Sequence, residues 1–389
     1  MDLSSTGRTG VVGAVMALAV AASITLVAGC QRNPETLKIG VGQPLSGNLK
    51  TLGQDMLNGA QMAADEINAE GGVRVGSQRL RIEILAQDDR SDAKAGEAAA
   101  TALVDRGVLV ALAHLNSGVS IAAAPIYAKA GVPQFAISTK PAYTQLGLPT
   151  TLRLVANDKL QSRAMGEYAA QLVGAERFAV IDDNTPYGKG LADDAAAAIT
   201  SRGKKVASRH SLDDKTVEFG PLVAELGTAK VDVIVTTLSD FQVEALIKQL
   251  VKAGLTQIRI LGGDTIKTDR LLRSGGQVGA IYATSPIIEA REFANGAKFL
   301  ASFRERFKGE PVYGAHYAYD TVHLVADAIT RNGSFDKAQL LQRLKTFDGS
   351  APVTGSLRFR PDGEQVYGAI AVYELRGGQW TPLMRSDRW

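Results

Sequence analysis

The sequence predicts an α/β protein built from two doubly wound, Rossmann-like units. Short apolar runs alternate along the chain with amphipathic segments of helical length, a rhythm typical of strand-helix units around a mainly parallel sheet. This rhythm starts at Leu37 and restarts after about residue 155, which indicates two successive units. The 389 residues, of which 45% are hydrophobic, suit two or three domains with sizeable cores.

The elements of the first unit follow from the period of their apolar residues. Met56, Ala60, Ala63 and Ile67 recur at helical spacing until Gly71-Gly72, which ends the helix. The continuously apolar run 108–113 predicts a strand that is buried on both faces. The expected strands are 37–41, a strand from 80 that ends at 88–89, 108–113, 133–137 and 151–155. The further expected helices are 92–106 and one that starts within 114–120 and continues through 121 to 130.

The second unit repeats this pattern, and the tail departs from it. Phe299, Phe303 and Phe307 line one face of a helix beyond the second unit. The tail predicts strands joined by turns at Pro361-Asp362-Gly363 and Gly377-Gly378. The expected strands are 177–181, 205–207, 232–237, 259–261, 280–284, 357–359 and 367–375. One expected helix begins at 158, another ends by 203, and two further helices span 241–253 and 317–329.

The N-terminal segment predicts export and lipidation. Val11–Ala28 is apolar and is followed by Val27-Ala28-Gly29-Cys30, which resembles the lipobox of bacterial lipoproteins. Cys30 is the only cysteine of the chain, so it cannot form an internal disulfide. We expect a signal peptide at 1–29, a lipidated Cys30, a tether at 30–36, and a location in the periplasm or cell envelope.

Charge and motifs argue against several other classes of protein. The net charge is +3 and no polybasic run occurs, so we expect no nucleic acid partner. Gly40-Val41-Gly42-Gln43-Pro44-Leu45 lacks the third glycine of a dinucleotide fingerprint, and no P-loop pattern occurs. His316 and His323 lie seven residues apart without a supporting ligand cluster. We therefore expect no cofactor and no metal.

Two strand ends predict a site for a carboxylate. Asn116 and Ser117 follow one apolar strand at the start of a helix, and Ser138 and Thr139 end the next strand. In an open α/β sheet, ligands bind outside the carboxyl ends of the strands, and a helix N-terminus there favours an anion. The alternative is that Ser117 and Thr139 are ordinary helix caps.

Asp264 adds an opposite requirement from the second unit. It ends the strand 259–261 after Gly262-Gly263, so it should reach the same crevice. A carboxylate facing hydroxyl and N–H groups across a cleft is what a zwitterion requires. The alternative is that Asp264 caps the helix expected near Thr268.

A hydrolase would need an activated nucleophile, and Ser117 with His114 is the only tempting pair. The surrounding Leu115-Asn116-Ser117-Gly118-Val119 is not the G-x-S-x-G elbow. We therefore expect no enzymatic activity, and keep a secreted serine hydrolase as the alternative from another class.

Short motifs recur in a specific order along nearly all of the expected mature chain: Leu37-Lys38-Ile39-Gly40-Val41, Leu45-Ser46-Gly47, Gly59-Ala60, Ala64-Asp65-Glu66-Ile67-Asn68, Gly71-Gly72, Asp88-Asp89, Tyr187-Gly188-Lys189-Gly190, Gly262-Gly263-Asp264 and Tyr317-Ala318-Tyr319-Asp320. In this order and spacing the chain resembles the periplasmic leucine/isoleucine/valine-binding protein family, the type I solute-binding proteins of ABC transporters. The resemblance implies two lobes that are joined by three crossovers. The lobes would close on an amino acid without catalysing a reaction.

The resemblance also assigns roles to individual residues. The family's carboxylate-binding serine and threonine fall on Ser117 and Thr139, and Ile137 would supply a backbone carbonyl to the ammonium. The acidic ammonium ligand falls on Asp264, and a tyrosine of the pocket wall falls on Tyr187. The crossovers would lie near residues 157, 287 and 365, which implies a first lobe of 37–157 and 288–365 and a second lobe of 158–287 and 366–389.

Some positions depart from the family pattern. The disulfide of some members would join Ser91 and Asn116, so it is absent here. The aromatic wall residue of the first lobe aligns with Leu52, and that of the second lobe aligns near Ser239 or Asp240. Asp240 would suit a polar or cationic ligand side chain, so branched-chain amino acids are only one possible ligand class.

These observations together predict an extracytoplasmic solute-binding protein of an ABC importer. It would capture an amino acid between two closing lobes, act as a monomer anchored to the membrane through Cys30, and deliver the ligand to a permease. The alternative within the same fold is a ligand sensor of the amidase-regulator type. Such a sensor acts in the cytoplasm, and the export signal argues against that role.

Overall fold

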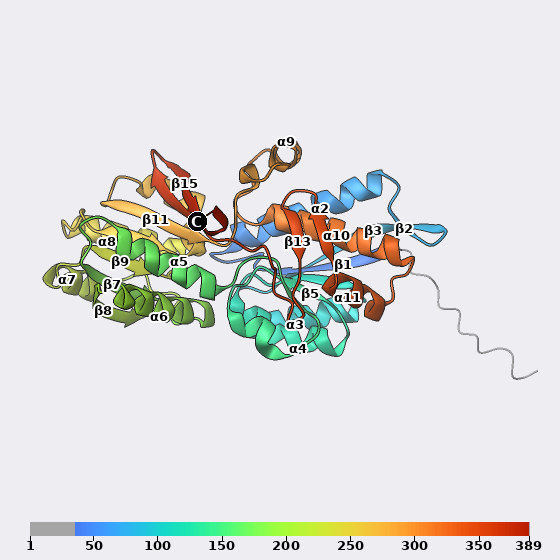
Figure 1. The fold of residues 1–389 in the computed structure, drawn as a ribbon, viewed down its shortest axis with the longest axis horizontal. Coiled ribbons are helices and arrows are strands. Elements are labelled where there is room, and N and C mark those ends of the chain that lie inside the picture. The colour runs from blue at the N-terminus through green and yellow to red at the C-terminus, as the bar shows by residue number, and fades with distance from the viewer. Residues whose placement is uncertain (1–35, 389) are drawn as a thin grey trace, which may run out of the picture. The chain divides into compact units, whose positions relative to one another are not determined.

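The computed structural model describes residues 36–388, and within them the chain forms two separate α/β sheets (Figure 1). The predicted signal peptide and Cys30 lie outside the described residues. The first strand, β1, begins at Thr36, a residue that the sequence prediction placed in the tether. Thr36 already pairs with Arg81 of a neighbouring strand, because the sheet register continues to that end.

The first sheet has six strands in the order β2-β3-β1-β4-β5-β6. Strands β3, β1, β4, β5 and β6 are parallel, and β2 is added to β3 as an antiparallel edge. Every residue of β4 is buried, as its continuous apolar run requires for a strand covered on both faces. The bounds are β1 Thr36–Gln43, β2 Val73–Val75, β3 Gln78–Asp88, β4 Val110–Ala113, β5 Gln134–Ala136 and β6 Thr151–Arg153.

The second sheet has seven strands in the order β15-β14-β11-β10-β9-β7-β8. Its strands β7 to β11 are parallel, and the C-terminal strands β14 and β15 join as an antiparallel edge. The bounds are β7 Arg177–Asp182, β8 Lys205–Ser211, β9 Val233–Thr236, β10 Arg259–Gly262, β11 Ala280–Ser285, β14 Ala371–Arg376 and β15 Gln379–Arg385, and a separate small hairpin contains β12 Asp348–Ala351 and β13 Gly355–Arg358.

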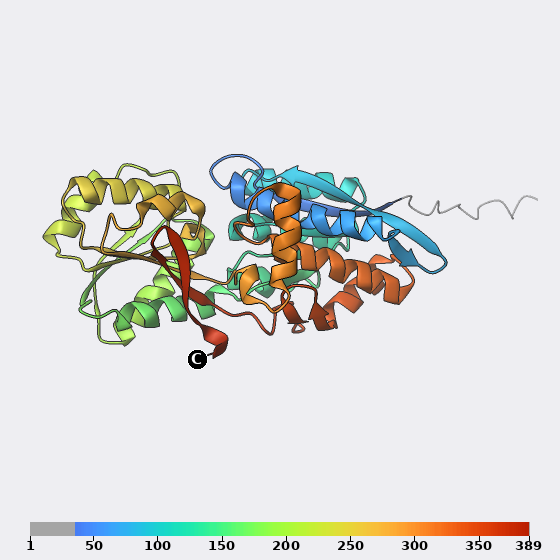
Figure 2. The same ribbon diagram turned by 90° about the horizontal axis from the view of Figure 1, so that it is seen from above.

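Helices cover both sheets. Helices α2 and α10 pack against each other, and α9 crosses α2 (Figure 2), so residues from far along the chain complete the core over the first sheet. The bounds are α2 Lys50–Ala69, α3 Ala93–Asp105, α4 Ser117–Lys129, α5 Asp158–Gln171, α6 Pro186–Ser201, α7 Gly220–Thr228, α8 Asp240–Lys252, α9 Gly296–Phe307, α10 Ala315–Asn332 and α11 Lys337–Lys345. Within residues 36–388, no helix combines the length and apolarity needed to cross a membrane.

The chain passes between the two sheets three times, after β6, after β11 and before β14. We name the six-stranded sheet with the helices packed on it the first lobe, and the seven-stranded sheet with its helices the second lobe. The predicted class, two doubly wound α/β lobes joined by three crossovers, is confirmed. The lobe boundaries at residues 157, 287 and 365 stay a prediction.

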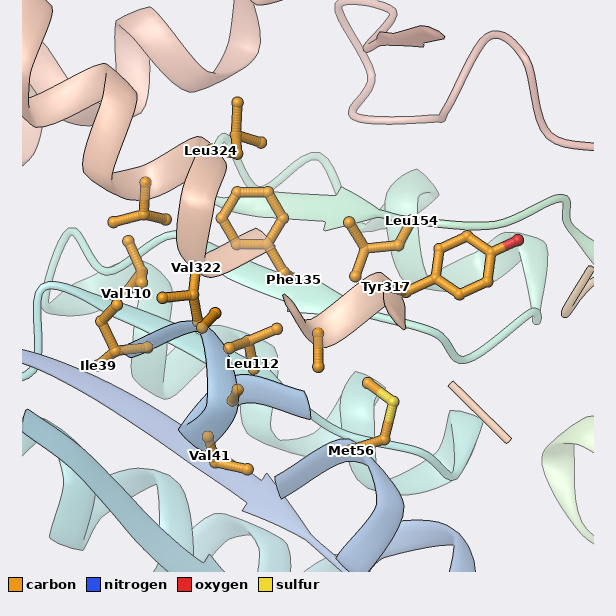
Figure 3. Close-up of a cluster of buried hydrophobic side chains, with 14 of the residues drawn as sticks. Ile39, Val41, Met56, Val110, Leu112, Phe135, Leu154, Tyr317, Val322 and Leu324 are labelled. Carbon is orange, nitrogen blue, oxygen red and sulfur yellow. The ribbon is translucent and has the colours of Figure 1, made fainter. Parts of the chain in front are cut away.

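The core of the first lobe shows why the pattern of apolar residues was informative (Figure 3). Alternate residues of β1, Ile39 and Val41, face the same buried cluster as Leu112 of β4 and Val322 of α10. Strand residues at spacing two and helix residues at helical spacing therefore meet in one layer. The second lobe buries a cluster on each face of its sheet, as a doubly wound sheet does.

Several element predictions need correction at their ends. The strand expected at 367–375 begins only at Ala371, because Gly368 lies against the backbone of the first crossover, where an added Cβ would come within 2.7 Å of the Ala156 nitrogen. The helix expected near Thr268 is a short 3₁₀ helix, Asp269–Ser274. The short elements β2, β12, α7 and α11 were not predicted, and the strand after the predicted turn at Gly377-Gly378, which is β15, was given no bounds.

Candidate functional site

A cavity of about 700 Å³ lies between the two lobes and is lined by loops from both sheets. The loops that line it from the first sheet include those after β1 and β4. These two strands are neighbours, although the chain first goes from β1 to β3, on the other side of β1, before it reaches β4. In the second sheet, the loops that follow β7 and β9 stand in the same relation. Such switch points are where open α/β sheets bind ligands.

The first-lobe wall of the cavity is rich in unsatisfied hydrogen-bonding groups. The helix α4 starts at Ser117, and its first amides have no carbonyl of a preceding turn to bond. The Oδ1 atom of Asn116 and the hydroxyl of Ser138 are buried and have no hydrogen-bond partner among residues 36–388. Buried polar atoms are nearly always paired, so these orphan groups indicate a polar ligand.

Ser117 is not a helix cap in this structure. The N-cap residue of α4 is Asn116, whose side chain makes no capping hydrogen bond. The Ser117 hydroxyl instead accepts a hydrogen bond from the Lys140 amide at 3.3 Å, and this bond joins the start of α4 to the loop after β5. The two hydroxyl clusters that the sequence analysis singled out therefore lie side by side on the cavity wall.

Arg153 holds the loop that carries Ser138 and Thr139. Its guanidinium donates to the carbonyls of Ser138 and Lys140, the latter at 2.8 Å. Arg153 is fully buried, and its Nε lies 3.1 Å from a carboxylate oxygen of Glu364, near the third crossover. The position of the loop is therefore fixed by a buried ion pair behind it.

Asp264 presents a carboxylate to the cavity from the second lobe. Its Oδ1 accepts hydrogen bonds from the Tyr187 hydroxyl at 2.9 Å and from the Gln161 amide at 3.1 Å, and its Oδ2 accepts one from the Tyr313 hydroxyl at 2.6 Å. The side chain does not cap the helix near Thr268, where Thr268 itself is the N-cap. No arginine or lysine of the described chain forms an ion pair with Asp264.

The two phenols beside Asp264 remain donors. Burial raises the pKa of Tyr187 and of Tyr313 well above the ordinary value, and the charge of Asp264 acts in the same direction. Both hydroxyls therefore stay protonated and donate to the carboxylate. Asp264 is only 4% exposed and receives three neutral donors, so its negative charge is not neutralised by the protein.

A second carboxylate, Asp158, lies behind the site at the start of α5. Burial raises its pKa to about 7. The nearby Thr139 hydroxyl partly offsets this rise in pKa. The charge of Asp264 raises the pKa further. Two acidic groups that repel each other therefore lie close together here, Asp264 at the cavity wall and Asp158 behind it.

Seven of the eight predicted ligand-contacting residues line the cavity: Asn116, Ser117, Ile137, Ser138, Thr139, Tyr187 and Asp264. Asp240 does not. Its Oδ2 accepts a hydrogen bond from the Thr268 hydroxyl at 2.8 Å and lies 3.3 Å from Arg270 Nε. The structure therefore does not bring the Asp240 carboxylate to the cavity, where it was expected to meet a cationic ligand side chain.

The site residues that were not predicted from the sequence include Gln161, Phe241 and Tyr313. Phe241 follows the position where a wall aromatic was expected, so a shift of one or two residues would have found it. Gln161 lies three residues after Asp158 on α5, a spacing that places both on one helix face. Tyr313 precedes the predicted helix by four residues, and no local pattern marks it.

The rest of the cavity is apolar inside and charged at the rim. Leu49, Leu115, Val119 and Phe241 supply apolar wall. Leu52, which aligns with the family's first-lobe aromatic, is a buried core residue and does not line the cavity. The charged lining residues are Arg90, Asp92, Asp183, Asp213, Asp214 and Lys215.

The pairing of His114 argues against the serine hydrolase alternative. The ring is fully buried, with Nδ1 2.8 Å from an Asp89 oxygen and Nε2 3.5 Å from the Tyr127 hydroxyl. Both nitrogens are therefore engaged away from Ser117, so His114 is not placed to activate that hydroxyl.

The comparisons with known proteins agree with this architecture. Residues 36–379 match the family model described as "Periplasmic binding protein". A "Leu/Ile/Val-binding protein homolog 2" of Brucella abortus is 30% identical over 88% of this chain and 91% of its own length. The "Leucine-, isoleucine-, valine-, threonine-, and alanine-binding protein" of Pseudomonas aeruginosa is 27% identical, over 93% of this chain and 94% of its own length.

Solved structures resemble the whole described chain. The leucine binding protein LivK of Thermotoga maritima has a TM-score of 0.81 at 24% identity and covers 91% of this chain and all of its own. A solute binding protein of R. palustris in complex with benzoate has a TM-score of 0.78 at 20% identity, covering 90% of this chain and 96% of its own. The same fold thus occurs in a protein named for binding leucine and in a protein solved with an aromatic acid.

Proposed function

The chain belongs to the periplasmic binding protein family, among its leucine/isoleucine/valine-binding proteins, and on this premise we propose that it captures an α-amino acid between its two lobes for an ABC importer. The ligand carboxylate would lie at the N-terminus of α4, with Ser117 and Thr139 as donors. The ligand ammonium would lie against Asp264, with the carbonyl of Ile137 as a second acceptor.

One observation carries this proposal. The cavity places a helix N-terminus with orphan polar groups on one wall and a buried carboxylate without a cation on the other. A buried charge that the protein leaves unpaired costs several kcal/mol. A zwitterion supplies an anion to the first wall and a cation to the second.

The aromatic acids bound by some structural neighbours suit this cavity less well. A benzoate carboxylate would satisfy the α4 wall but would bring no cation to Asp264 and Asp158. The apolar wall of Leu49, Leu115 and Phe241 suits an aliphatic or aromatic ligand side chain, and the charged rim leaves the exact amino acid open.

Location and partners follow from the same family. We propose a lipid-anchored protein outside the cytoplasm, held by acyl chains on Cys30, that presents its ligand to the permease subunits of an importer. Stable anchoring needs more than one acyl chain, since a single chain binds membranes only marginally. The ligand sensor of the amidase-regulator type remains the alternative, and an export signal argues against its cytoplasmic role.

A thermal-shift screen over amino acids, amides and benzoates tests the proposal. A ligand at 100 to 1,000 times its Kd stabilises the folded protein by about 3 to 4 kcal/mol. We expect at least one α-amino acid to raise the melting temperature, and the matching amide without a carboxylate to fail. Stabilisation by benzoates alone would contradict the proposal.

A further inference from the structure

We propose that the hydroxyl of Tyr313 is a latch that stabilises the closed arrangement of the two lobes, by donating a hydrogen bond from the first lobe to Asp264 of the second. The inference goes beyond the proposed function and rests on it only in that closure of the lobes is what captures a ligand. Its basis is the rigidity of the two groups that meet in this bond.

On the first-lobe side, the loop that carries Tyr313 is fixed to α2. The Asp55 carboxylate, which is 4% exposed, accepts hydrogen bonds from three backbone amides of this loop, Val312 at 2.9 Å, Tyr313 at 3.0 Å and Ala315 at 2.8 Å. Gly314 lies so close to Met56 that an added Cβ would come within 2.6 Å of its sulfur. The loop therefore moves only together with the first lobe.

On the second-lobe side, Asp264 is fixed by residues of its own lobe. Tyr187 belongs to α6 and Gln161 to α5, and both donate to the same carboxylate oxygen. The Gln161 amide also contacts the Thr284 carbonyl at the end of β11, at 3.2 Å. The other oxygen of Asp264 is left to the first lobe, where it meets Tyr313.

The bond between these two rigid groups is short and charge-assisted. Its length of 2.6 Å lies in the range expected for a hydroxyl that donates to a carboxylate. Any opening of the lobes at this point must break it, and hydrogen bonds to charged groups contribute more than neutral ones. The neighbouring contact, Gly118 of α4 against Pro186 of α6, is apolar and small.

The latch leaves room for a ligand. A carboxylate offers about four acceptor positions, and protein donors occupy three of those of Asp264. One position remains for an ammonium group. The Tyr313 bond therefore persists in the liganded state, and its energy biases the protein toward the closed state before and after ligand binding.

Electron-spin distance measurements on ligand-free protein test the latch. Nitroxide labels would be placed at Lys94→Cys on α3 and Asp194→Cys on α6, both exposed and outside the cavity lining, in a Cys30→Ser background. We expect a closed population with a short distance, and expect Tyr313→Phe to lower the closed-to-open ratio by about ten-fold to about a hundred-fold, the scale of one hydrogen bond to a charged group.

Tyr319→Phe is the matched control, because it removes a phenol that donates to a carboxylate, Glu66, within the first lobe and outside the cavity lining. Its closed-to-open ratio should stay within about two-fold of the parent, the difference expected when no bond between the lobes is lost. Circular dichroism and melting temperature establish that each variant is folded. The inference is overturned if the parent shows no closed population, if Tyr313→Phe leaves the distances unchanged, or if both variants shift them equally. These readings need no ligand, so they stand even if the thermal-shift screen finds no amino acid.

Discussion

The two sides of the contact between the lobes treat carboxylates in opposite ways. On the hinge side, Glu289 lies 2.6 Å from Lys267 Nζ, and Glu292 accepts a hydrogen bond from Tyr373 at 2.7 Å and lies 3.6 Å from Arg385. On the cleft side, Asp264 receives only neutral donors. The protein completes the charge balance at its hinge and leaves it incomplete at the cleft, where a cationic ligand group would complete it.

The carboxylate near the third crossover, Glu364, also has a cationic partner, like those on the hinge side. Glu364 receives Arg153 on both of its oxygens and the Thr144 hydroxyl at 2.6 Å, and all three side chains are buried. Glu364 and Asp264 are thus two buried carboxylates that each accept three hydrogen bonds, but only Glu364 has a cation as a partner. We therefore expect removal of the first charge to affect folding, and removal of the second to affect binding.

The largest expected effect is that of Glu364→Gln on stability. The change leaves Arg153 buried without its counter-charge, and breaking a buried pair from one side costs about 3 to 5 kcal/mol. Urea denaturation of the ligand-free protein measures this loss. Asp327→Asn, which removes an exposed pair with Arg331, is the control and should cost about 0.5 kcal/mol or less. Equal losses from the two variants would contradict the role of the buried pair.

Asp264→Asn should do the reverse. It keeps the shape of the side chain, and the ligand ammonium then loses its anion, which should weaken binding of an amino acid by about 2 to 5 kcal/mol, or thirty-fold to several thousand-fold. Isothermal titration with the amino acid from the screen measures the change. Ligand-free stability should fall less than in Glu364→Gln. Affinity within about two-fold of the parent would mean that Asp264 does not bind the ammonium.

Ser117→Ala addresses the opposite wall and should have a smaller effect. It removes one hydroxyl donor to a charged acceptor, which is worth about 1.5 to 3 kcal/mol of affinity. Ser120→Ala is the matched control, since the Ser120 hydroxyl donates a hydrogen bond to the His114 carbonyl and does not line the cavity. If both serines change affinity alike, the carboxylate is not held at Ser117.

Sequence patterns predicted the fold well because the relevant forces are local in the chain. The burial of Val110–Ala113 follows from its continuous apolar run, and the end of α2 follows from Gly71-Gly72. Site residues at strand ends, such as Ser117 and Asp264, were also predictable, because parallel strands bring their carboxyl ends to one edge. These inferences need only the position of each residue within its own element.

The residues that escaped prediction depend on contacts between distant segments. Tyr313 reaches Asp264 only because Asp55, more than 250 residues earlier in the chain, fixes its loop. Asp240 was expected at the cavity because it aligns near the second-lobe wall aromatic of the family, but Thr268 and Arg270 hold its carboxylate elsewhere. No periodicity within one segment contains such information.

The smallest expected effect is on the pH dependence of folding stability. The contribution of the cleft side and that of the hinge side change in opposite directions with pH. The folded-state pKa of Asp158, about 7, lies above its unfolded value, so the folded protein holds a proton that the unfolded chain releases. Stability therefore falls as pH rises from about 4 toward 7. On the hinge side, burial lowers the pKa of His316 to about 3, so its contribution is lost as pH falls below 6.5.

Asp158→Asn isolates the cleft contribution from that of His316. Because one pKa unit corresponds to about 1.4 kcal/mol, the variant should gain roughly 1 to 2 kcal/mol relative to the parent between about pH 5.5 and pH 7. Denaturation curves at several pH values measure this difference, and the slope matters more than the offset that the amide itself introduces. A stability difference that does not vary with pH would mean that Asp158 is already ionised in the folded protein. The cleft would then carry two full negative charges, and the demand for a cationic ligand group would be greater than one ammonium meets.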